Sequence, residues 1–371
     1  MQGMILYTLL LAVGTAVAAA ISPRMTLQRG TRREALNRVY LMLLFLILVI
    51  PSVLRLYTGN DYYTYIEHFH DVRCGHYVVT EPGFNILVKL VYSALGGEYF
   101  LVIFGIFAVA TVFFFIKAFY EQSCDMAISF FLFLALGLYF QSYNSVRYYL
   151  ALAMGLYSLG FVKRKEWGKF FITVLAAALF HKTALVMLLL YPAAYIPWKK
   201  WYYAVLAALG VSGLVFKDLY MKLFVFLYPS YVNEEEYLNG DYFSIVNIAR
   251  CLAVIALYIF VYQFEKKELS QRPACALYLK MNILALLLYS CFSFVPFVSR
   301  IGYYLNVSQL LLIPELILCL KDKKREAALA ALLFGGAVYF LAFLYKADDM
   351  YINILPYTTW LSVPDGMLPV F

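Results

Sequence analysis

Cationic side chains stand at five positions of a sequence whose surroundings are apolar. Arg147 in NSVRYY and Arg300 in FVSRIGYY begin apolar segments, Arg250 lies within FSIVNIARCLAV, and His181-Lys182 interrupts LAAALFHKTALVMLLL. Snorkelling to the interface explains any one of them, but an arginine within the apolar zone is costly. Guanidinium groups bind phosphate oxygens through paired hydrogen bonds, which a low-dielectric wall strengthens. We therefore predict that these residues form one anionic site, in which cations take the place of a metal around a diphosphate leaving group.

Two carboxylates are candidates for a general base. Asp61 lies in GNDYYTY and Glu81 in EPGF. Gly-Asn-Asp and Glu-Pro-Gly are also common turn sequences, so a purely structural role is the alternative for both. A carboxylate held at the membrane surface would accept a proton from an attacking hydroxyl group. The sequence leaves open which of the two acts in this way.

The segment HFHDVRCGH raises the possibility of zinc. His68, His70, Cys74 and His76 cluster there, but their spacing matches no recognised ligand pattern. The chain has six cysteines without a Cys-x-x-Cys motif, so neither a disulfide framework nor a zinc ribbon is indicated. We predict a polar external loop and no metal.

The elements that position these residues are apolar helices. The chain is 64% hydrophobic and 14% charged, with a mean hydropathy of +0.76, which is typical of an all-α polytopic membrane bundle. We predict about twelve transmembrane segments in one membrane domain, residues 1–371. They are 4–21, 39–56, 99–119, 127–142, 146–162, 169–180, 183–197, 201–216, 244–264, 275–294, 302–320 and 327–345. The pair 169–180 and 183–197 is short, which predicts a thin hairpin or a re-entrant pair meeting at residues 180–182.

The distribution of basic residues predicts the orientation. One set of alternate loops carries 19 Lys and Arg, and the opposite set carries 8. The positive-inside rule places the first set in the cytoplasm and both termini outside. The first segment lacks a basic residue before its apolar core, so we expect a retained helix. The external segments are 57–98 and 217–243, and FNILVKLVYSAL in the first predicts a helix lying on the surface.

Several function classes are excluded by what the sequence lacks. It contains no G-x-x-x-x-G-K-[ST] motif and no dinucleotide fingerprint, and no predicted cytoplasmic loop is large enough to hold a nucleotide. Direct use of ATP or a nucleotide sugar is therefore not expected, and we predict no cofactor. The net charge of +8 follows the membrane topology, so we predict the lipid bilayer as partner and no nucleic acid. Any chemistry takes place in the membrane or at its outer face.

The motifs together resemble those of a known family. GNDYYTY, EPGFNILVKLV, NSVRYYLALAMGLYSLGFVKRKEWGKFFITVLAAALFHKTAL, SRIGYY and LPYTTW follow one another in the order and spacing of the EpsG family. That family is similar to Wzy-type polysaccharide polymerases, and the likeness runs from about residue 57 to 360. Tyr148 follows Arg147 where the family usually has glutamine, so no role for that glutamine transfers to this chain.

The resemblance implies a function and a set of roles. It implies a GT-C-like glycosyltransferase of the bacterial plasma membrane, inverting and metal-independent, which polymerises repeat units of exopolysaccharide, capsule or O-antigen. The donor and partner would be an undecaprenyl-diphosphate-linked oligosaccharide, with a chain-length regulator and a flippase as candidate protein partners. Arg147, Lys182, Arg250 and Arg300 would bind the diphosphate. The catalytic candidates are Asp61 or Glu81 as the base and His181 as a hydrogen-bonding or proton-shuttling group.

Rival functions come from other classes. A flippase or exporter of the same lipid would need cations through the depth of the bilayer and commonly an internal repeat, and we find no repeat. An O-antigen ligase shares the diphosphate chemistry, and a membrane acyltransferase or a structural membrane component are further alternatives. Sequence alone separates polymerase and ligase poorly.

Overall fold

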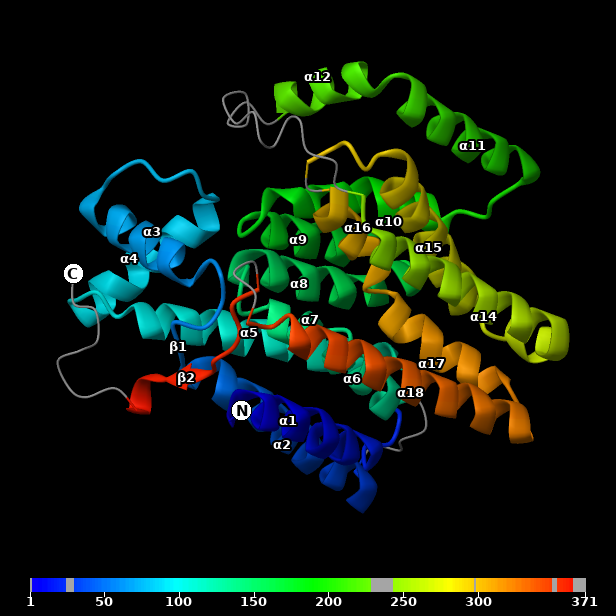
Figure 1. Cartoon of the computed structure of the whole chain (residues 1–371), viewed down its shortest axis with the longest axis horizontal. Coiled ribbons are helices and arrows are strands. Elements are labelled where there is room, and N and C mark those ends of the chain that lie inside the picture. The colour runs from blue at the N-terminus through cyan, green and yellow to red at the C-terminus, as the bar shows by residue number, and fades with distance from the viewer. Residues whose placement is uncertain (1, 25–29, 228–242, 297, 349–351, 363–371) are drawn as a thin grey trace. The chain divides into compact units, whose positions relative to one another are not determined.

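A computed structural model describes residues 2–24, 30–227, 243–296, 298–348 and 352–362 of the chain. The regular secondary structure of these residues consists of α-helices, 3-10 turns and one pair of two-residue strands (Figure 1). They divide into two compact units, the first made of residues 1–182 and 321–371 and the second of residues 183–320. We describe each unit by itself.

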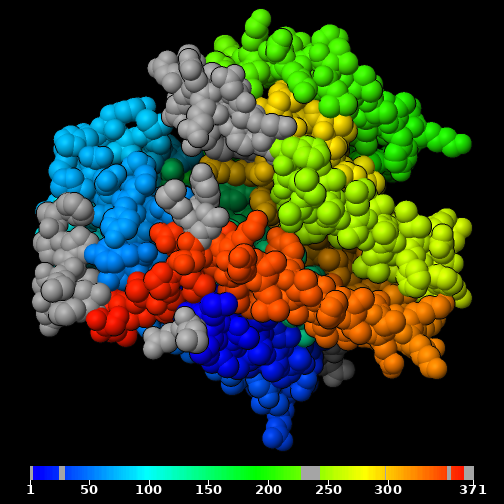
Figure 2. All heavy atoms as spheres, in the orientation of Figure 1, coloured from blue at the N-terminus to red at the C-terminus, as the bar shows by residue number. Residues whose placement is uncertain are grey.

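Unit 1 contains both ends of the chain. Its elements are α1 (Gln2–Ala19), α2 (Arg32–Leu54), β1 (Arg55–Leu56), α3 (Tyr62–Cys74), α4 (Pro82–Leu95), α5 (Phe100–Gln122), α6 (Met126–Ala135), α7 (Leu138–Gln141), α8 (Val146–Lys163), α9 (Trp167–Ala178), α18 (Asp322–Tyr345), β2 (Thr358–Thr359) and a 3-10 turn, Trp360–Ser362. Helix α8 is buried along nearly its whole length and packs against α5 and α9. Figure 2 shows α18 and the following chain as a band on the surface of this unit, beside the N-terminal helices.

Unit 2 begins at Thr183, within the 3-10 turn Lys182–Val186. Its helices are α10 (Met187–Tyr195), α11 (Lys200–Val215), α12 (Lys217–Leu227), α14 (Ile245–Ser270), α15 (Pro273–Cys291), α16 (Val298–Asn306) and α17 (Gln309–Cys319). Helix α15 packs against α10, α11, α14, α16 and α17 and is therefore the centre of this unit.

The apolar segments confirm the prediction of a polytopic helical membrane protein. Within the described ranges, six helices are long and apolar enough to cross a membrane, with α16 and α17 counted as one span, or seven if α11 and α12 form one span across their 87° bend. Shorter apolar helices accompany them, including α9 and the helix over Lys182–Tyr195. Helix α9 ends before the break at residues 179–181, as predicted for the 169–197 region. The count of about twelve segments and the likeness to GT-C folds stay predictions.

One predicted continuous segment is broken in the structure, and the prediction was wrong in that detail. Segment 127–142 divides into α6 and α7 because Gly137 adopts φ +74°, a left-handed conformation that ends α6. A Cβ atom at Gly137 would come within 2.9 Å of the Phe343 ring on α18, so close packing also favours glycine here. Segment 302–320 contains a short turn at residues 307–308, where the Ser308 hydroxyl donates to the carbonyl of Leu305, but α16 and α17 together still form one candidate span, Val298–Cys319.

Residues 57–98, which the charge distribution predicts to be external, are more ordered than a loop. They contain α3 and α4, which lie together at one end of α5 (Figure 1). Helix α4 buries Phe84, Val88 and Tyr92 and exposes Lys89, which is the amphipathic helix predicted there. In the second segment predicted to be external, 217–243, residues 217–227 form α12, and residues 228–242 lie outside the described part of the chain.

Candidate functional site

Arg147 begins the buried helix α8. Side chains near a helix start lean toward its N-terminus, so Arg147 extends toward the end of the helix that the charge distribution places outside. The remainder of α8 is apolar and buried, which fixes the position of this first turn. The Arg147 side chain is only 17% exposed. A guanidinium group at such depth needs compensating partners.

Glu81 supplies the main partner of Arg147. Its carboxylate Oε2 forms an ion pair with Arg147 Nη1, and the Glu81 side chain is 12% exposed. The guanidinium group also lies over the rings of Phe84, at 5.1 Å, and Tyr65, at 5.7 Å. Its Nε atom is buried and has no hydrogen-bond partner among the described residues. The pair is therefore well packed but retains one unused donor, which an oxygen-rich ligand would satisfy.

The second carboxylate oxygen of Glu81 bonds the backbone at the break that follows α9. Glu81 Oε1 accepts a hydrogen bond of 3.0 Å from the backbone N–H of Lys182. Nearby, the Gly83 N–H donates to the carbonyl of Leu179 at 2.9 Å, and a Cβ at Gly83 would lie 2.7 Å from that oxygen. The start of α4 therefore packs against residues 179–182. Glu81 contacts both Arg147 and the backbone of this break.

His181 and Lys182 contribute in different ways. His181 is 9% exposed and its ring packs edge-on against Tyr148 of α8, with centroids 5.2 Å apart. Lys182 has an exposed side chain and gives its backbone N–H to Glu81. The two residues lie at the break that follows α9, where the sequence predicted that two short helices meet, and His181 packs beside the start of α8.

Asp61 lies close to the same helix start. It precedes the first residue of α3, and its Oδ2 accepts a 3.0 Å hydrogen bond from Ser145 Oγ. Ser145 stands two residues before Arg147 in the sequence, so the two candidate carboxylates approach the same turn of α8. Asp61 has no ion-pair partner among the described residues, whereas Glu81 does.

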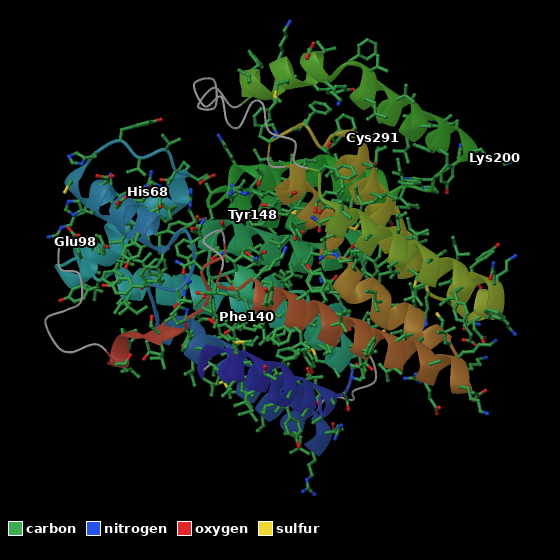
Figure 3. All side chains as sticks on the ribbon, in the orientation of Figure 1. His68, Glu98, Phe140, Tyr148, Lys200 and Cys291 are labelled. Atoms are coloured by element: carbon green, nitrogen blue, oxygen red, sulfur yellow. The ribbon has the colours of Figure 1, made fainter. Side chains whose placement is uncertain are left out.

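A further titratable side chain, His68, lies on α3, the helix that Asp61 precedes (His68 is labelled in Figure 3). Burial lowers the pKa of His68 below its ordinary value, and the positive charge of Arg147 lowers it further. The carboxylates of Asp71, Glu67 and Asp61 oppose this shift. A lowered pKa favours neutral imidazole, which can accept or donate a hydrogen bond.

The other residues of HFHDVRCGH pair among themselves and with Glu98. His70 Nδ1 lies 3.1 Å from Glu98 Oε1, and Arg73 Nη1 lies 3.3 Å from the same oxygen. His76 Nδ1 lies 3.0 Å from Asp71 Oδ1. The described residues hold no group of three or more His, Cys, Asp or Glu side chains arranged for a metal ion.

Arg250 and Arg300 belong to unit 2. The guanidinium group of Arg250, on α14, lies 5.5 Å from the ring centroid of Tyr303 on α16. Arg300 precedes Tyr303 by three residues on α16 and so shares its helix face. Of the two arginines, Arg250 is the one that contacts the Tyr303 ring.

A buried polar network supports the Arg250 region. The Asn306 carbonyl oxygen accepts bonds from Cys251 Sγ at 3.2 Å and Gln309 Nε2 at 3.1 Å, and the Asn306 amide donates to Tyr289 at 3.1 Å. Gln309 Nε2 also donates to Asn282 Oδ1 at 2.6 Å. These bonds join α14, α15, α16 and α17 and fix the side of α14 next to Arg250.

The structure thus arranges the predicted residues in two groups. Asp61, Glu81, Arg147, His181 and Lys182 lie near the start of α8 in unit 1, and Arg250 and Arg300 lie on α14 and α16 of unit 2. Sequence reasoning missed the contributions of Tyr65, Phe84 and Ser145, and it considered His68 only as a metal ligand. Nothing marked those two rings among the 65 Tyr and Phe residues of the chain.

A bundle of membrane-length apolar helices with buried cations and carboxylates grouped at helix ends defines an integral, multi-pass membrane protein. The chain belongs to the EpsG family, whose sequence model matches residues 38–359. This match confirms the resemblance drawn from the motifs, and it supports a role of the membrane polysaccharide polymerase type with glycosyltransferase-like chemistry. No curated protein and no solved structure matches the chain.

Proposed function

We propose that this protein polymerises lipid-linked oligosaccharide repeat units at the outer face of the bacterial plasma membrane. The donor is a growing chain on undecaprenyl diphosphate, and the acceptor is an incoming repeat unit. The observation that carries the proposal is the buried Arg147, which is paired with Glu81 and retains an unused Nε donor, while Asp61 bonds Ser145 two residues before it in the chain. Family membership supports the class of reaction.

The arginines bind the leaving group in this proposal. A diphosphate gains negative charge as the glycosidic bond breaks, and preorganised cations stabilise that charge most when they are shielded from water. Arg147 is shielded in this way and has a free donor. Lys182 supplies a further cation in unit 1, and the diphosphate-binding role of Arg250 and Arg300 stays a prediction from the sequence.

Asp61 is the better candidate for the base. Glu81 is committed on both oxygens, to Arg147 and to the Lys182 N–H, which suits a residue that positions the cation. Asp61 accepts one bond, from the hydroxyl of Ser145. A carboxylate with unused lone pairs can accept a proton from a sugar hydroxyl.

The proposed step balances as an inverting displacement. The acceptor hydroxyl gives its proton to the Asp61 carboxylate, and its oxygen forms a bond to C1 of the donor sugar. The bond from C1 to the diphosphate oxygen breaks, and its electron pair leaves with the carrier diphosphate. His181 donates or relays a hydrogen bond beside the leaving group, on the side where it packs against Tyr148.

Replacing Arg147 tests the proposal. Arg147→Lys keeps a cation for Glu81 but loses the planar fork, so we expect normal protein abundance and a fall in chain elongation of roughly a hundredfold. Arg147→Ala should abolish elongation. Arg164→Ala, which removes the arginine at the other end of α8, is the control and should elongate normally. Normal chain lengths in the Arg147 variants would refute the assignment.

Reconstitution in vesicles distinguishes the alternatives. With lipid-linked repeat units supplied, a ladder of products means polymerase. One-step transfer to another acceptor means ligase, and movement of the lipid without new bonds means flippase. Either of the last two results would overturn the proposed reaction.

A further inference from the structure

An apolar groove on unit 1 lies between α2 and α5. It has a volume of about 390 Å³ and is lined by Leu41, Met42, Phe45, Phe113, Ile116 and Tyr120, together with the charged Arg38 and Lys117. The two helices pack directly against each other, and both are long and apolar enough to span the membrane. Met42 is 58% exposed and Phe113 is 46% exposed. In a membrane, such a surface faces lipid chains.

The two cations of the groove lie at one level of the bilayer. Arg38 is six residues from the start of α2, and Lys117 is five residues from the end of α5, which places each about 8–9 Å from the helix end by the helical rise. Both helix ends belong to the basic loops that the positive-inside rule assigns to the cytoplasm. The groove is therefore apolar with a basic end at the level of the inner-leaflet headgroups.

The charge of Lys117 has no acidic partner in the described part of the chain. Its Nζ lies over the rings of Phe113, at 5.3 Å, and Tyr157, at 5.2 Å. Arg38 forms an ion pair of 2.9 Å with Glu34, but its side chain is 74% exposed. Exposed pairs of this kind are weak, so Arg38 can turn toward a phosphate group. The basic end of the groove thus carries a net positive charge that the protein itself leaves uncompensated.

We infer that this groove binds an anionic phospholipid of the inner leaflet. The acyl chains lie over the apolar residues of α2 and α5, and Lys117 and Arg38 contact the phosphate. Basic pockets between transmembrane helices on the cytoplasmic side suit anionic headgroups for this electrostatic reason. The inference is independent of the proposed polymerase reaction.

Native mass spectrometry of the purified full-length protein tests this inference. The protein is titrated with phosphatidylglycerol and, separately, with phosphatidylcholine of the same acyl chains. We expect tighter binding of phosphatidylglycerol, and a loss of roughly fivefold in its affinity for each cation removed in Lys117→Gln and Arg38→Gln/Lys117→Gln. Inorganic phosphate at the same concentration should not displace the lipid, because the groove binds the chains as well.

The matched control is Arg32→Gln/Arg325→Gln, which removes two exposed cytoplasmic arginines that do not line the groove and should retain the preference. Thermal unfolding verifies that each variant folds. If Arg38→Gln/Lys117→Gln does not fold, the test uses Lys117→Gln alone. Equal binding of the two lipids, an unchanged preference in the Lys117 variants, an equal loss in the control, or displacement by inorganic phosphate would each overturn the inference.

Discussion

Arg147 and Glu81 are opposite charges buried against each other at the starts of α8 and α4. The attraction within such a pair offsets the free energy of desolvation only when the geometry is good and further interactions are made. Here the N–H of Lys182 donates a hydrogen bond to Glu81, and the Tyr65 and Phe84 rings lie against the guanidinium group. An anionic substrate would compete with Glu81 for the guanidinium group. The pair is therefore suited to hold Arg147 in position while the site is empty and to share it when a diphosphate arrives.

Substituting the two carboxylates separates their proposed roles. Asp61→Asn removes the base, so we expect kcat to fall by roughly 10² to 10⁴-fold with little change in KM. Glu81→Gln keeps the size of the side chain but removes the charge of the ion pair with Arg147. We therefore expect a smaller fall in kcat and a changed KM for the lipid-linked donor. Steady-state rates in vesicles measure both. If Glu81→Gln has the larger effect on kcat, the roles are reversed.

His68 should make stability depend on pH. Its folded-state pKa is lowered by burial and by Arg147, whereas the unfolded chain takes up the proton near the ordinary value of about 6.5. Below that pH the unfolded state binds more protons, so stability falls as the pH drops from about 6.5 through the lower folded-state pKa and then levels off. The carboxylates around it, Asp61, Glu67 and Asp71, oppose the shift but do not cancel it.

The check is the thermal unfolding midpoint in detergent between pH 8 and pH 5. His68→Gln should lose less stability over this range than the unsubstituted protein, because it removes the group whose protonation the fold disfavours. The comparison between the two proteins removes the contribution of other titrating groups. Identical pH profiles would show that protonation of His68 is equally favourable in both states.

At the scale of elements, the loop before α3 (residues 57–61) and the loop before α8 (residues 142–145) are hydrogen-bonded to each other, and we call the two together the platform. Arg55 is buried and donates from Nη1 to the carbonyls of Thr58, at 2.8 Å, and Tyr143, at 2.5 Å. The N–H of Asn60 donates to Asn144 Oδ1 at 2.9 Å. These bonds join the loop that carries Asp61 to the loop that leads to Arg147. The strand pair β1–β2 then attaches the C-terminal segment to the same place, with Arg55 opposite Thr359.

Gly59 tests this platform. It adopts φ +113°, and a Cβ atom there would lie 2.5 Å from the carbonyl oxygen of Tyr143. Gly59→Ala should therefore cost about 1–3 kcal/mol from backbone strain, displace the Asp61 loop and lower elongation. Gly75→Ala is the matched control, since Gly75 has φ +78° with open space around it and should cost about 1 kcal/mol without loss of activity. Unfolding midpoints and product ladders measure both, and equal effects would contradict a platform role.

The sequence predicted elements better than their junctions. Helices such as α5 follow directly from apolar runs, because in lipid every backbone polar group must bond within its own helix. The break at Gly137 depends on its packing against Phe343, more than 200 residues away in the chain, and no local pattern reports that contact. The β1–β2 pair has the same origin, since its two strands lie at residues 55–56 and 358–359.

The candidate site divides in the same way. Arg147 and His181 stood out because a polar residue among apolar neighbours is costly and needs a reason. The pairing of Glu81 with Arg147 joins residues 66 positions apart, and only the fold shows that Glu81 is committed while Asp61 is not. The sequence therefore identified polar residues whose burial among apolar neighbours costs free energy, but only the packing of the fold shows what each of them contacts.

At the scale of the whole molecule, orientation decides whether the proposed site faces the acceptor sugars. Every proposed role for Asp61, Glu81 and Arg147 requires residues 57–98 to lie outside the cytoplasm. The prediction of that orientation comes from the charges of the loops alone, 19 basic residues in one set against 8 in the other. Helix α3 carries a natural reporter, because Cys74 at its end is exposed while the other five cysteines are buried or partly buried.

A membrane-impermeant maleimide should therefore label intact cells at Cys74, provided that any outer envelope layer is permeable to the reagent. Cys74→Ser should lose this labelling and otherwise behave normally, since the weak contact of Cys74 with His70 at 3.5 Å is its only described side-chain bond. Sealed inverted vesicles should label Cys74 only after detergent is added, because the reagent cannot cross to the lumen. Labelling of Cys74 in inverted vesicles but not in cells would place α3 in the cytoplasm, and the outward-facing glycosyl transfer would then be impossible with this site.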